Sequence, residues 1–541
     1  MVRRTLKSLM SESLVKKLCT AALAVTAFAV SSQAISQTAG GTMVMIAQPE
    51  PPSLAPYLST SGPIGLVAPK IYSGLLDYDL ELNPVSELAK SWEVSEDGLT
   101  VTFKLQEGVT WHDGEPFSSA DVQFSILEVL KKFHPRGPNT FREVNSIDTP
   151  DALTAVFHLD RPAPYMIRAL SAYESPIVPK HLLEGKDVRE AELSSHPIGT
   201  GPFKFVEWKK GQYIRLDKNE NYWKEGLPLL DRIVARIIPD ASTRTAAMES
   251  GEVHYGAFGA IPNIDVIRLR DSDDIGVTTD GYSMINPMAL LEFDTTQAPF
   301  DSKALRQAIS MSVDRQFLID NVWFGYGKPA TSAMTSNYEP LGLYVPTANY
   351  PASPDVAAAN ALLDEAGLKP DANGVRATAV IDLIPYGEEW RRLGEYMKQA
   401  MADIGLQLEI RYEDVPTWLK RVYADYDFSL NVNYFYQLSD PVIGVQRHYG
   451  TDQIRQGTPF VNSSRYSNAK VDELLAAAAV EPDSTQRGEY YAELQNILAE
   501  DLPVLNLFEM EFLTVYNEQL KDHTVSAMGA YGSFDRAWLD N

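Results

Sequence analysis

Between residues 377 and 434 the hydrophobic pattern changes four times between a period of two and a helical period. The stretches ATAVIDLI (377–384), LQLEIRY (406–412) and FSLNVNY (428–434) are typical of β-strands. Two amphipathic stretches separate them, EEWRRLGEYMKQAMADIG (388–405) and TWLKRVYADY (417–426). This strand–helix order predicts a mostly parallel sheet with crossover helices.

The rest of the chain divides into two regions. Residues 40–285 mix turns with short alternating strands, such as 99–105, 152–159 and 213–217, which is typical of an α+β lobe. After residue 290 helices dominate, and the sequence predicts them at 301–323, 353–367, 468–480 and 484–500, followed by a strand at 504–510. In the second of these helices, Ser353 is the expected cap, Pro354 the first helical residue and Gly367 the terminator. We therefore expect a mixed α/β chain with two lobes.

In an open parallel sheet, ligands bind at the carboxyl ends of the strands. Here those ends gather aromatic residues, with two arginines one turn into the following helix: Tyr386, Trp418, Tyr434, Phe435, Tyr436, Arg391 and Arg392. Aromatic walls with a few charges are typical of a small-molecule cleft. The alternative is that about half of these aromatic residues belong to the core.

The first 36 residues carry the features of a secretory signal peptide. Five basic residues precede the apolar stretch 18–30, and Ser32-Gln33-Ala34 offers a cleavage site, with cutting after Ala34 or Ser36. A retained membrane anchor is the alternative, but the stretch is shorter than the roughly 20 residues that span a bilayer. Cleavage would remove Cys19, the only cysteine, so the mature chain would have no disulfide, as suits a periplasmic protein.

The charge of the chain excludes some partners. The 541 residues include 47 Lys and Arg and 72 Asp and Glu, a net charge of −25. Removing the signal peptide takes away five basic residues and one acidic residue, which changes the net charge to −29. Such a chain is not expected to bind nucleic acid or anionic membranes.

The segment TWHDGEPFSSADV (110–122) resembles a metal or acid–base site because His112, Asp113 and Glu115 lie close together. A structural explanation is stronger: Ser118 and Asp121 form a helix capping box, and Asp113-Gly114 is a turn. No second histidine has a ligand spacing, so no metal site is expected.

Catalytic signatures are absent elsewhere. The sequence contains no G-x-S-x-G, H-E-x-x-H or phosphate-binding G-x-x-x-x-G-K-[ST] motif, and Ser467-Asn468-Ala469-Lys470 is better explained as a helix start. An enzyme is therefore the weaker hypothesis, and no cofactor is expected.

One long block, ELAKSWEVSEDGLTVTFKLQEGVTWHDGEPFSSADVQFSI (87–126), is distinctive. It resembles the entry signature of the extracytoplasmic solute-binding proteins of family 5, the receptors of peptide, nickel and opine ABC importers. Residues 197–253, 299–330 and 391–410 extend the resemblance in the family's order over essentially the whole mature chain.

The resemblance implies a bilobal periplasmic-binding-protein-like fold of type II, cluster C, with an extra subdomain in the first lobe and two crossover strands near 286–293 and 505–513. The implied domains are a signal peptide (1–36), lobe I (37–285, with the insertion at roughly 75–200), lobe II (286–510) and a return to lobe I (511–541). The protein would act as a monomer that closes on its ligand and then docks on ABC permease subunits of the inner membrane.

The resemblance also implies ligand contacts. Asp440, in NYFYQLSDP, matches the aspartate that holds the α-amino group of a peptide, and Arg391 or Arg392 matches an arginine for the carboxylate. A buried charge needs a partner of opposite charge, and the planar guanidinium binds both carboxylate oxygens. The loop QLSDP is less glycine-rich than in typical dipeptide receptors.

The function that follows is capture of a peptide or a peptide-like amino-acid conjugate. The alternatives are the same role for an opine or an oligosaccharide and, remotely, a secreted hydrolase. The scattered histidines offer no constellation suited to a nickel complex.

Overall fold

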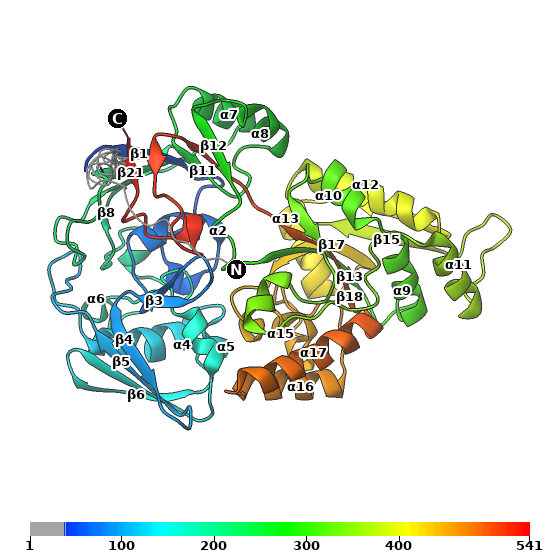
Figure 1. Cartoon of the computed structure of the whole chain (residues 1–541), viewed down its shortest axis with the longest axis horizontal. Helices are drawn as coiled ribbons and strands as arrows, with labels where there is room; N and C mark the ends of the chain where they lie inside the picture. The colour runs from blue at the N-terminus through cyan, green and yellow to red at the C-terminus, as the bar shows by residue number, and fades with distance from the viewer. Residues whose placement is uncertain (1–36, 38, 541) are drawn as a thin grey trace, which may run out of the picture. The chain divides into compact units, whose positions relative to one another are not determined.

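Residue 37 and residues 39–540 are the part of the chain that the computed structural model describes, and they form two lobes around separate β-sheets (Figure 1). The predicted signal peptide, residues 1–36, lies outside the described residues. Within the described residues no helix has the length and apolar character needed to cross a membrane.

Lobe I is built on a seven-stranded sheet whose strands come from both ends of the described chain. β1 pairs in parallel with β10 and β11, whereas β9 pairs antiparallel with β8 and β10. The late strand β19 lies between β11 and β12, so the chain returns to lobe I after completing lobe II. The strands are β1 (Thr42–Ile46), β8 (Phe203–Lys209), β9 (Tyr213–Lys218), β10 (Arg232–Arg236), β11 (Tyr255–Gly256), β12 (Ile275–Thr278) and β19 (Thr514–Asn517).

A second, antiparallel sheet of four strands lies between β1 and β8 in the chain. Its order is β4-β5-β7-β6, and it confirms the strands predicted at 99–105 and 152–159. Its members are β4 (Ala89–Val94), β5 (Thr100–Leu105), β6 (Val144–Asp151) and β7 (Thr154–Leu159). The helix that starts after Ser118 is α3 (Ser119–Phe124), which continues as a π-helical turn (Ser125–Leu130). The predicted capping box is confirmed: the Asp121 carboxylate accepts the backbone N–H of Ser118 at 2.8 Å.

Shorter elements complete lobe I. The helices are α2 (Gly62–Val67), α4 (Lys131–Phe133), α5 (Gly137–Thr140), α6 (Lys180–Leu183), α7 (Ala241–Glu249) and α8 (Asn263–Leu269). The short strands pair as β2 (Leu76–Tyr78) with β3 (Pro84–Ser86) and β20 (Leu520–Lys521) with β21 (Trp538–Leu539).

Lobe II is built on a six-stranded sheet of order β14-β18-β13-β17-β15-β16. β15 pairs in parallel with β16 and β17, as the strand–helix order predicted. β13, β14 and β18 pair antiparallel, so the expectation of a mostly parallel sheet is wrong. All three of these strands lie outside the strand–helix run at 377–434, whose pattern gives no direction for them. The strands are β13 (Pro287–Phe293), β14 (Gly327–Pro329), β15 (Ala377–Leu383), β16 (Leu406–Arg411), β17 (Leu430–Tyr436) and β18 (Val504–Met510).

The helices of lobe II follow the predicted ranges with two corrections. The single helix expected at 301–323 is two helices, because the Asp314 carboxylate caps a new helix by accepting from the N–H of Phe317. The helix expected at 353–367 begins later, because its cap is Asp355 rather than Ser353. The helices are α9 (Lys303–Ser312), α10 (Arg315–Asn321), α11 (Val356–Glu365), α12 (Glu388–Ala402), α13 (Val415–Leu419, continued by a π-helical turn to Asp425), α14 (Pro441–Gly444), α15 (Gln446–Tyr449), α16 (Ala469–Val480) and α17 (Ser484–Asp501).

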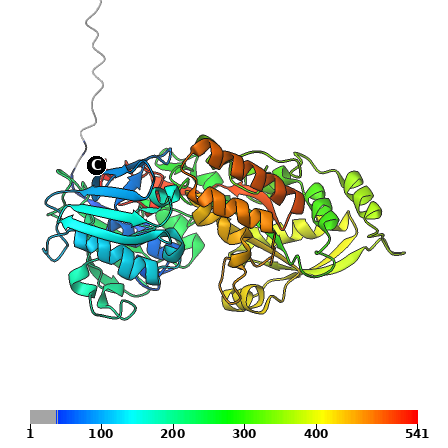
Figure 2. The same ribbon diagram turned by 90° about the horizontal axis from the view of Figure 1, so that it is seen from below.

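Two connections link the lobes, one after β12 and one after β18. β13 and β18, the strands of lobe II that adjoin these connections, are buried along their whole length at the centre of the sheet. α16 and α17 lie side by side in lobe II (Figures 1 and 2). The connections themselves, residues 279–286 and 511–513, are short and lie outside the sheets, so each lobe has a rigid frame and few residues join the two.

Candidate functional site

A cavity of about 780 Å³ lies at the carboxyl ends of β15 and β17, and its walls come from both lobes. This volume is within the range of small-molecule sites, about 300–1,000 Å³. Lobe I contributes the segments after β1 and around the start of α2, and lobe II contributes the ends of two parallel strands. The lining residues are Gln48, Pro49, Glu50, Pro52, Ser59, Thr60, Ser61, Gly62, Pro63, Leu66, Arg136, Phe258, Tyr386, Tyr434, Phe435, Tyr436, Arg447, Phe460, Phe512 and Tyr531.

Aromatic rings form one wall of the cavity and continue across the connection between the lobes. The Tyr434 ring lies 5.7 Å from that of Tyr436 and 6.3 Å from that of Phe512, measured between centroids. Phe512 in turn lies 5.4 Å from Phe258, which stacks on Tyr531 at 4.7 Å. Burial raises the pKa of Tyr434 well above its usual range, so its hydroxyl stays neutral and can donate a hydrogen bond. The wall therefore offers apolar faces with a few hydroxyl groups, which suits an organic ligand.

Three charged side chains line the cavity. Glu50 accepts hydrogen bonds from the Trp208 indole N–H at 2.9 Å and from the backbone N–H of Gly211. Arg136 forms a two-point ion pair with Glu174, at 2.7 and 2.6 Å, that is almost completely buried. Arg447 is the third. Glu50 and Arg136 belong to lobe I and Arg447 to lobe II, so the closed cavity brings charges of both lobes together.

Three of the residues predicted as ligand contacts line the cavity: Tyr386, Tyr434 and Tyr436. Their positions follow from the strand ends, as expected, because Tyr434 and Tyr436 end β17 and Tyr386 follows β15. Tyr386 is the most accessible, with 46% of its surface exposed. Whether these tyrosines contact a ligand stays a prediction.

Trp418 is placed elsewhere. Its side chain is buried in the core of lobe II, where the indole N–H donates to the Asn431 side chain at 2.9 Å and the ring meets the edge of Tyr423. The alternative stated for any single aromatic residue, that it belongs to the core, describes this one.

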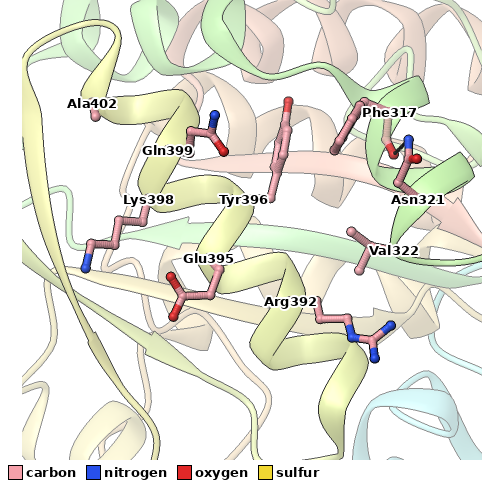
Figure 3. A pocket seen from close by; sticks show the side chains of 9 residues that line it. All are labelled: Phe317, Asn321, Val322, Arg392, Glu395, Tyr396, Lys398, Gln399 and Ala402. Atoms are coloured by element: carbon pink, nitrogen blue, oxygen red, sulfur yellow. Dashed lines mark hydrogen bonds between the residues drawn. The ribbon is translucent and has the colours of Figure 1, made fainter.

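Neither Arg391 nor Arg392 lines the cavity. The Arg391 guanidinium lies over the Tyr412 ring, 3.7 Å from its centroid. Arg392 borders a separate, open depression of about 590 Å³ between α10 and α12, beside Val322 and Glu395. Figure 3 shows this depression, with Arg392 and Glu395 on α12. Their predicted contact with a ligand carboxylate stays a prediction, and the structure does not bring them to the cavity.

Asp440 is completely buried, and its carboxylate already has a cationic partner. Both of its oxygens accept hydrogen bonds from the guanidinium of Arg487 in α17, at 2.9 and 2.8 Å. The carboxylate also caps α14 by accepting from the backbone N–H of Val442 at 3.0 Å. Asp440 is not among the residues that line the cavity. Its predicted contact with a ligand amine stays a prediction. Asp440 also has a structural role, as the partner of Arg487 and the cap of α14.

The loop that contains Asp440 is held close to the connection between the lobes. The backbone N–H groups of Gln437 and Leu438 donate to the carbonyls of Asn286 and Ile285, and the Ser439 hydroxyl donates to the Arg168 carbonyl of lobe I at 2.7 Å. A side chain on Gly444 would collide with the Gln437 carbonyl, because its Cβ would lie 1.9 Å from that oxygen. The loop is therefore fixed in place by both lobes.

The group His112, Asp113 and Glu115 does not form a site. The His112 ring lies 2.9 Å from the Gly201 carbonyl and accepts from the backbone N–H of Gly199. Burial lowers the pKa of His112 to about 4, so the ring is neutral. Within residue 37 and residues 39–540 no group of three or more His, Cys, Asp or Glu side chains is placed to hold a metal ion.

The sequence reasoning did not single out several cavity residues. Glu50, Arg136, Phe258, Phe512 and Tyr531 come from four segments distant from the parallel strands, and no spacing connects them. Arg447 lies eleven residues after the end of β17, close enough to a strand end to be a candidate from the sequence. Its neighbour His448 is buried against Phe435.

Comparison with known proteins shows the family of this chain. The sequence profile of the bacterial extracellular solute-binding proteins, family 5, matches residues 83–456, more than half of the chain. The chain belongs to this family. The resemblance found in the sequence is thus confirmed.

Relatives and solved structures extend the match over the whole family 5 fold. The chain is 26% identical to the glutathione-binding protein GsiB of Pectobacterium atrosepticum over 480 residues, which are 86% of this chain and 88% of that protein. The GsiB protein of Salmonella paratyphi A is 27% identical over 494 residues, with 90% and 92% covered.

Among solved structures, the ABC transporter substrate-binding protein CtaP of Listeria monocytogenes is similar with a TM-score of 0.81 and 25% identity, over 93% of this chain and all of that one. The oligopeptide-binding protein AppA of Bacillus subtilis, in complex with a nonapeptide, shares the fold with a TM-score of 0.78 and 23% identity, covering 93% of this chain and 100% of that one. The predicted bilobal fold is confirmed, and the family and these relatives are binding proteins rather than enzymes.

Proposed function

We propose that this family 5 protein is the periplasmic receptor of an ABC importer, which captures a peptide or a peptide-like amino-acid conjugate and delivers it to permease subunits in the inner membrane. The observation that carries the proposal is the cavity of about 780 Å³ walled by both lobes at the carboxyl ends of β15 and β17. The relatives named for glutathione and the receptor solved with a nonapeptide support a peptide-like ligand. The predicted signal peptide supports the periplasm.

Closure of the lobes is the mechanism that the architecture favours. We assign residues 286–510 to one closing unit, and residues 39–285 with the return segment 511–540 to the other. A ligand held by both walls binds the closed form better than the open form, so it shifts the population towards closure. Closure also removes water from the ligand, which strengthens the hydrogen bonds and ion pairs that it makes in the cavity.

Two measurements test this function. The small molecules released when the purified protein is denatured are identified by mass spectrometry, and we expect a peptide or an amino-acid conjugate. The released compound, added back to ligand-free protein, should reduce the radius of gyration measured by small-angle X-ray scattering, with the protein monomeric by size-exclusion chromatography.

Other outcomes point to the alternatives. An opine or a sugar keeps the receptor role but removes the peptide class. Turnover of the added compound would indicate a hydrolase. An unchanged radius of gyration with saturating ligand contradicts capture by closure.

A further inference from the structure

The charged side chain that lobe II contributes to the cavity has no partner of opposite charge in the described part of the chain. Of the three charged side chains that line the cavity, Glu50 is held by donors from lobe I, and Arg136 is neutralised by Glu174. Arg447 has no carboxylate partner among the described residues. Lobe II therefore contributes to the cavity a guanidinium without an ion-pair partner within residues 39–540, and we infer the charge of the ligand from what that group needs.

The contacts of Arg447 leave part of its hydrogen-bonding capacity unused. Its Nε–H donates to the Gly444 carbonyl at 3.2 Å and an Nη2–H donates to the Tyr436 carbonyl at 2.8 Å. Nη1 makes no hydrogen bond within the described residues. An arginine has five N–H donors, and a cation that loses water without an anionic partner is unfavourable. Arg447 is thus anchored by two carbonyls of its own lobe while other donors remain available in the cavity.

The surroundings of Arg447 also favour the binding of an anion. The Arg447 guanidinium lies over the Phe435 ring, 5.3 Å from its centroid, and the side chain is partly buried. Burial, and then the nearby positive charge of Arg136, lower the pKa of Arg447 to about 10, so it remains charged at neutral pH. Arg136 comes from the start of α5 in lobe I and Arg447 from α15 in lobe II (Figure 1). A ligand whose anion binds Arg447 and whose remainder contacts the wall from lobe I would favour the closed form.

We propose that Arg447 binds a carboxylate of the ligand, so that this receptor selects acidic ligands. The inference rests on the proposed function, because it names the ligand class of the same cavity. It assigns recognition of the ligand anion to Arg447 rather than to Arg391 or Arg392, which do not line the cavity. A carboxylate fits because its two oxygens match the geometry of a guanidinium.

The test compares acid and amide forms of the same peptides. Tri-alanine and glutathione, each as the free acid and as the C-terminal amide, are titrated into ligand-free protein by calorimetry. We expect the acids to bind about tenfold or more tightly than the amides, as a charge-assisted hydrogen bond implies. The ratio of acid affinity to amide affinity should fall below threefold in Arg447→Met and should be partly retained in Arg447→Lys. It should be unchanged in the control Arg270→Met, which replaces an exposed arginine of lobe I.

A thermal readout separates ligand binding from folding. Because Arg447 is a partly buried charge without a carboxylate partner in the described chain, Arg447→Met should leave the melting temperature of the ligand-free protein unchanged or higher. A structural arginine would instead lower it. Equal binding of acid and amide, or an acid-to-amide ratio that survives in Arg447→Met, overturns the inference while peptide capture stands.

A result in which none of these peptides binds also tests the inference. If the molecule released from the parent protein is a non-peptide with a carboxylate, and Arg447→Met is purified without it, the peptide class fails and the inference stands. A released molecule without a carboxylate overturns the inference.

Discussion

The buried pair of Asp440 and Arg487 allows a measurement that separates structural support from ligand contact. Replacing Asp440 with alanine leaves the Arg487 guanidinium, only 7% exposed, without a carboxylate, and with the Ala478 carbonyl as its remaining strong acceptor. Removing one partner of a buried ion pair costs about 3–5 kcal/mol. The variant also loses the cap at Val442, which lies in the same loop.

The expected effect on melting follows from the size of lobe II. Unfolding about 225 residues at roughly 2.1 cal/mol/K per residue gives an entropy near 0.5 kcal/mol/K, so each kcal/mol corresponds to about 2 °C. Asp440→Ala should therefore lower the melting temperature of lobe II by about 6–10 °C, measured by calorimetry on ligand-free protein. In the double variant with Arg487→Met the loss should be much smaller, because no charge is left unpaired.

A second ion pair of the same lobe, in which the carboxylate is buried, provides a control. Asp382 is bound at two points by Arg411, at 2.6 and 2.7 Å, and neither residue lines the cavity. Asp382→Ala should destabilise lobe II without a direct effect on ligand affinity. If Asp440 also holds the ligand amine, as predicted, Asp440→Ala should weaken the affinity for an amine-bearing ligand well beyond the effect of Asp382→Ala. An affinity within twofold of the parent would remove the ligand role, and a melting temperature within about 2 °C of the parent would refute the structural one.

Three further variants test other parts of the chain. Burial raises the pKa of Glu292 to about 7 in the folded protein, above its unfolded value of 4.5, so the folded protein loses stability as the pH rises between these values. In urea unfolding, Glu292→Gln should be about 3 kcal/mol more stable than the parent at pH 8 and equal to it at pH 4. A difference that does not depend on pH contradicts this. Tyr386→Ala should weaken ligand binding about three- to tenfold in calorimetry, with little change in melting because the side chain is half exposed; unchanged affinity would show that this tyrosine does not contact the ligand. Asp314→Ala removes the cap of α10 and should cost about 1 kcal/mol by urea unfolding; a cost below about 0.3 kcal/mol would mean that the cap is not needed.

The local sequence pattern predicted a structural element well where one segment of the chain contains all the residues that specify it. The capping box of Ser118 and Asp121, the strands around 377–434 and the helices α16 and α17 depend on neighbours in the sequence, and the structure contains them. The break between α9 and α10 was missed because the apolar spacing continues through it, while the cap of Asp314 interrupts the helix.

The candidate site was predicted only in part, for a related reason. Tyr434 and Tyr436 were found because they end a strand whose direction the strand–helix order determines. Asp440 was predicted to contact a ligand amine, and its partner within the protein, Arg487, was not predicted because it lies 47 residues later and no sequence spacing connects the two.

The sequence by itself determined the family, the two-lobe α/β class and the edge of the sheet at which aromatic residues gather, because each of these follows from periodicity or from long ordered blocks. Only the tertiary structure decided which charges have partners: it buries Asp440 against Arg487 and leaves Arg447 facing the cavity without a carboxylate. The physical reason is that the state of a charged group depends on burial and on groups within a few ångströms, and folding brings those groups together from distant parts of the chain.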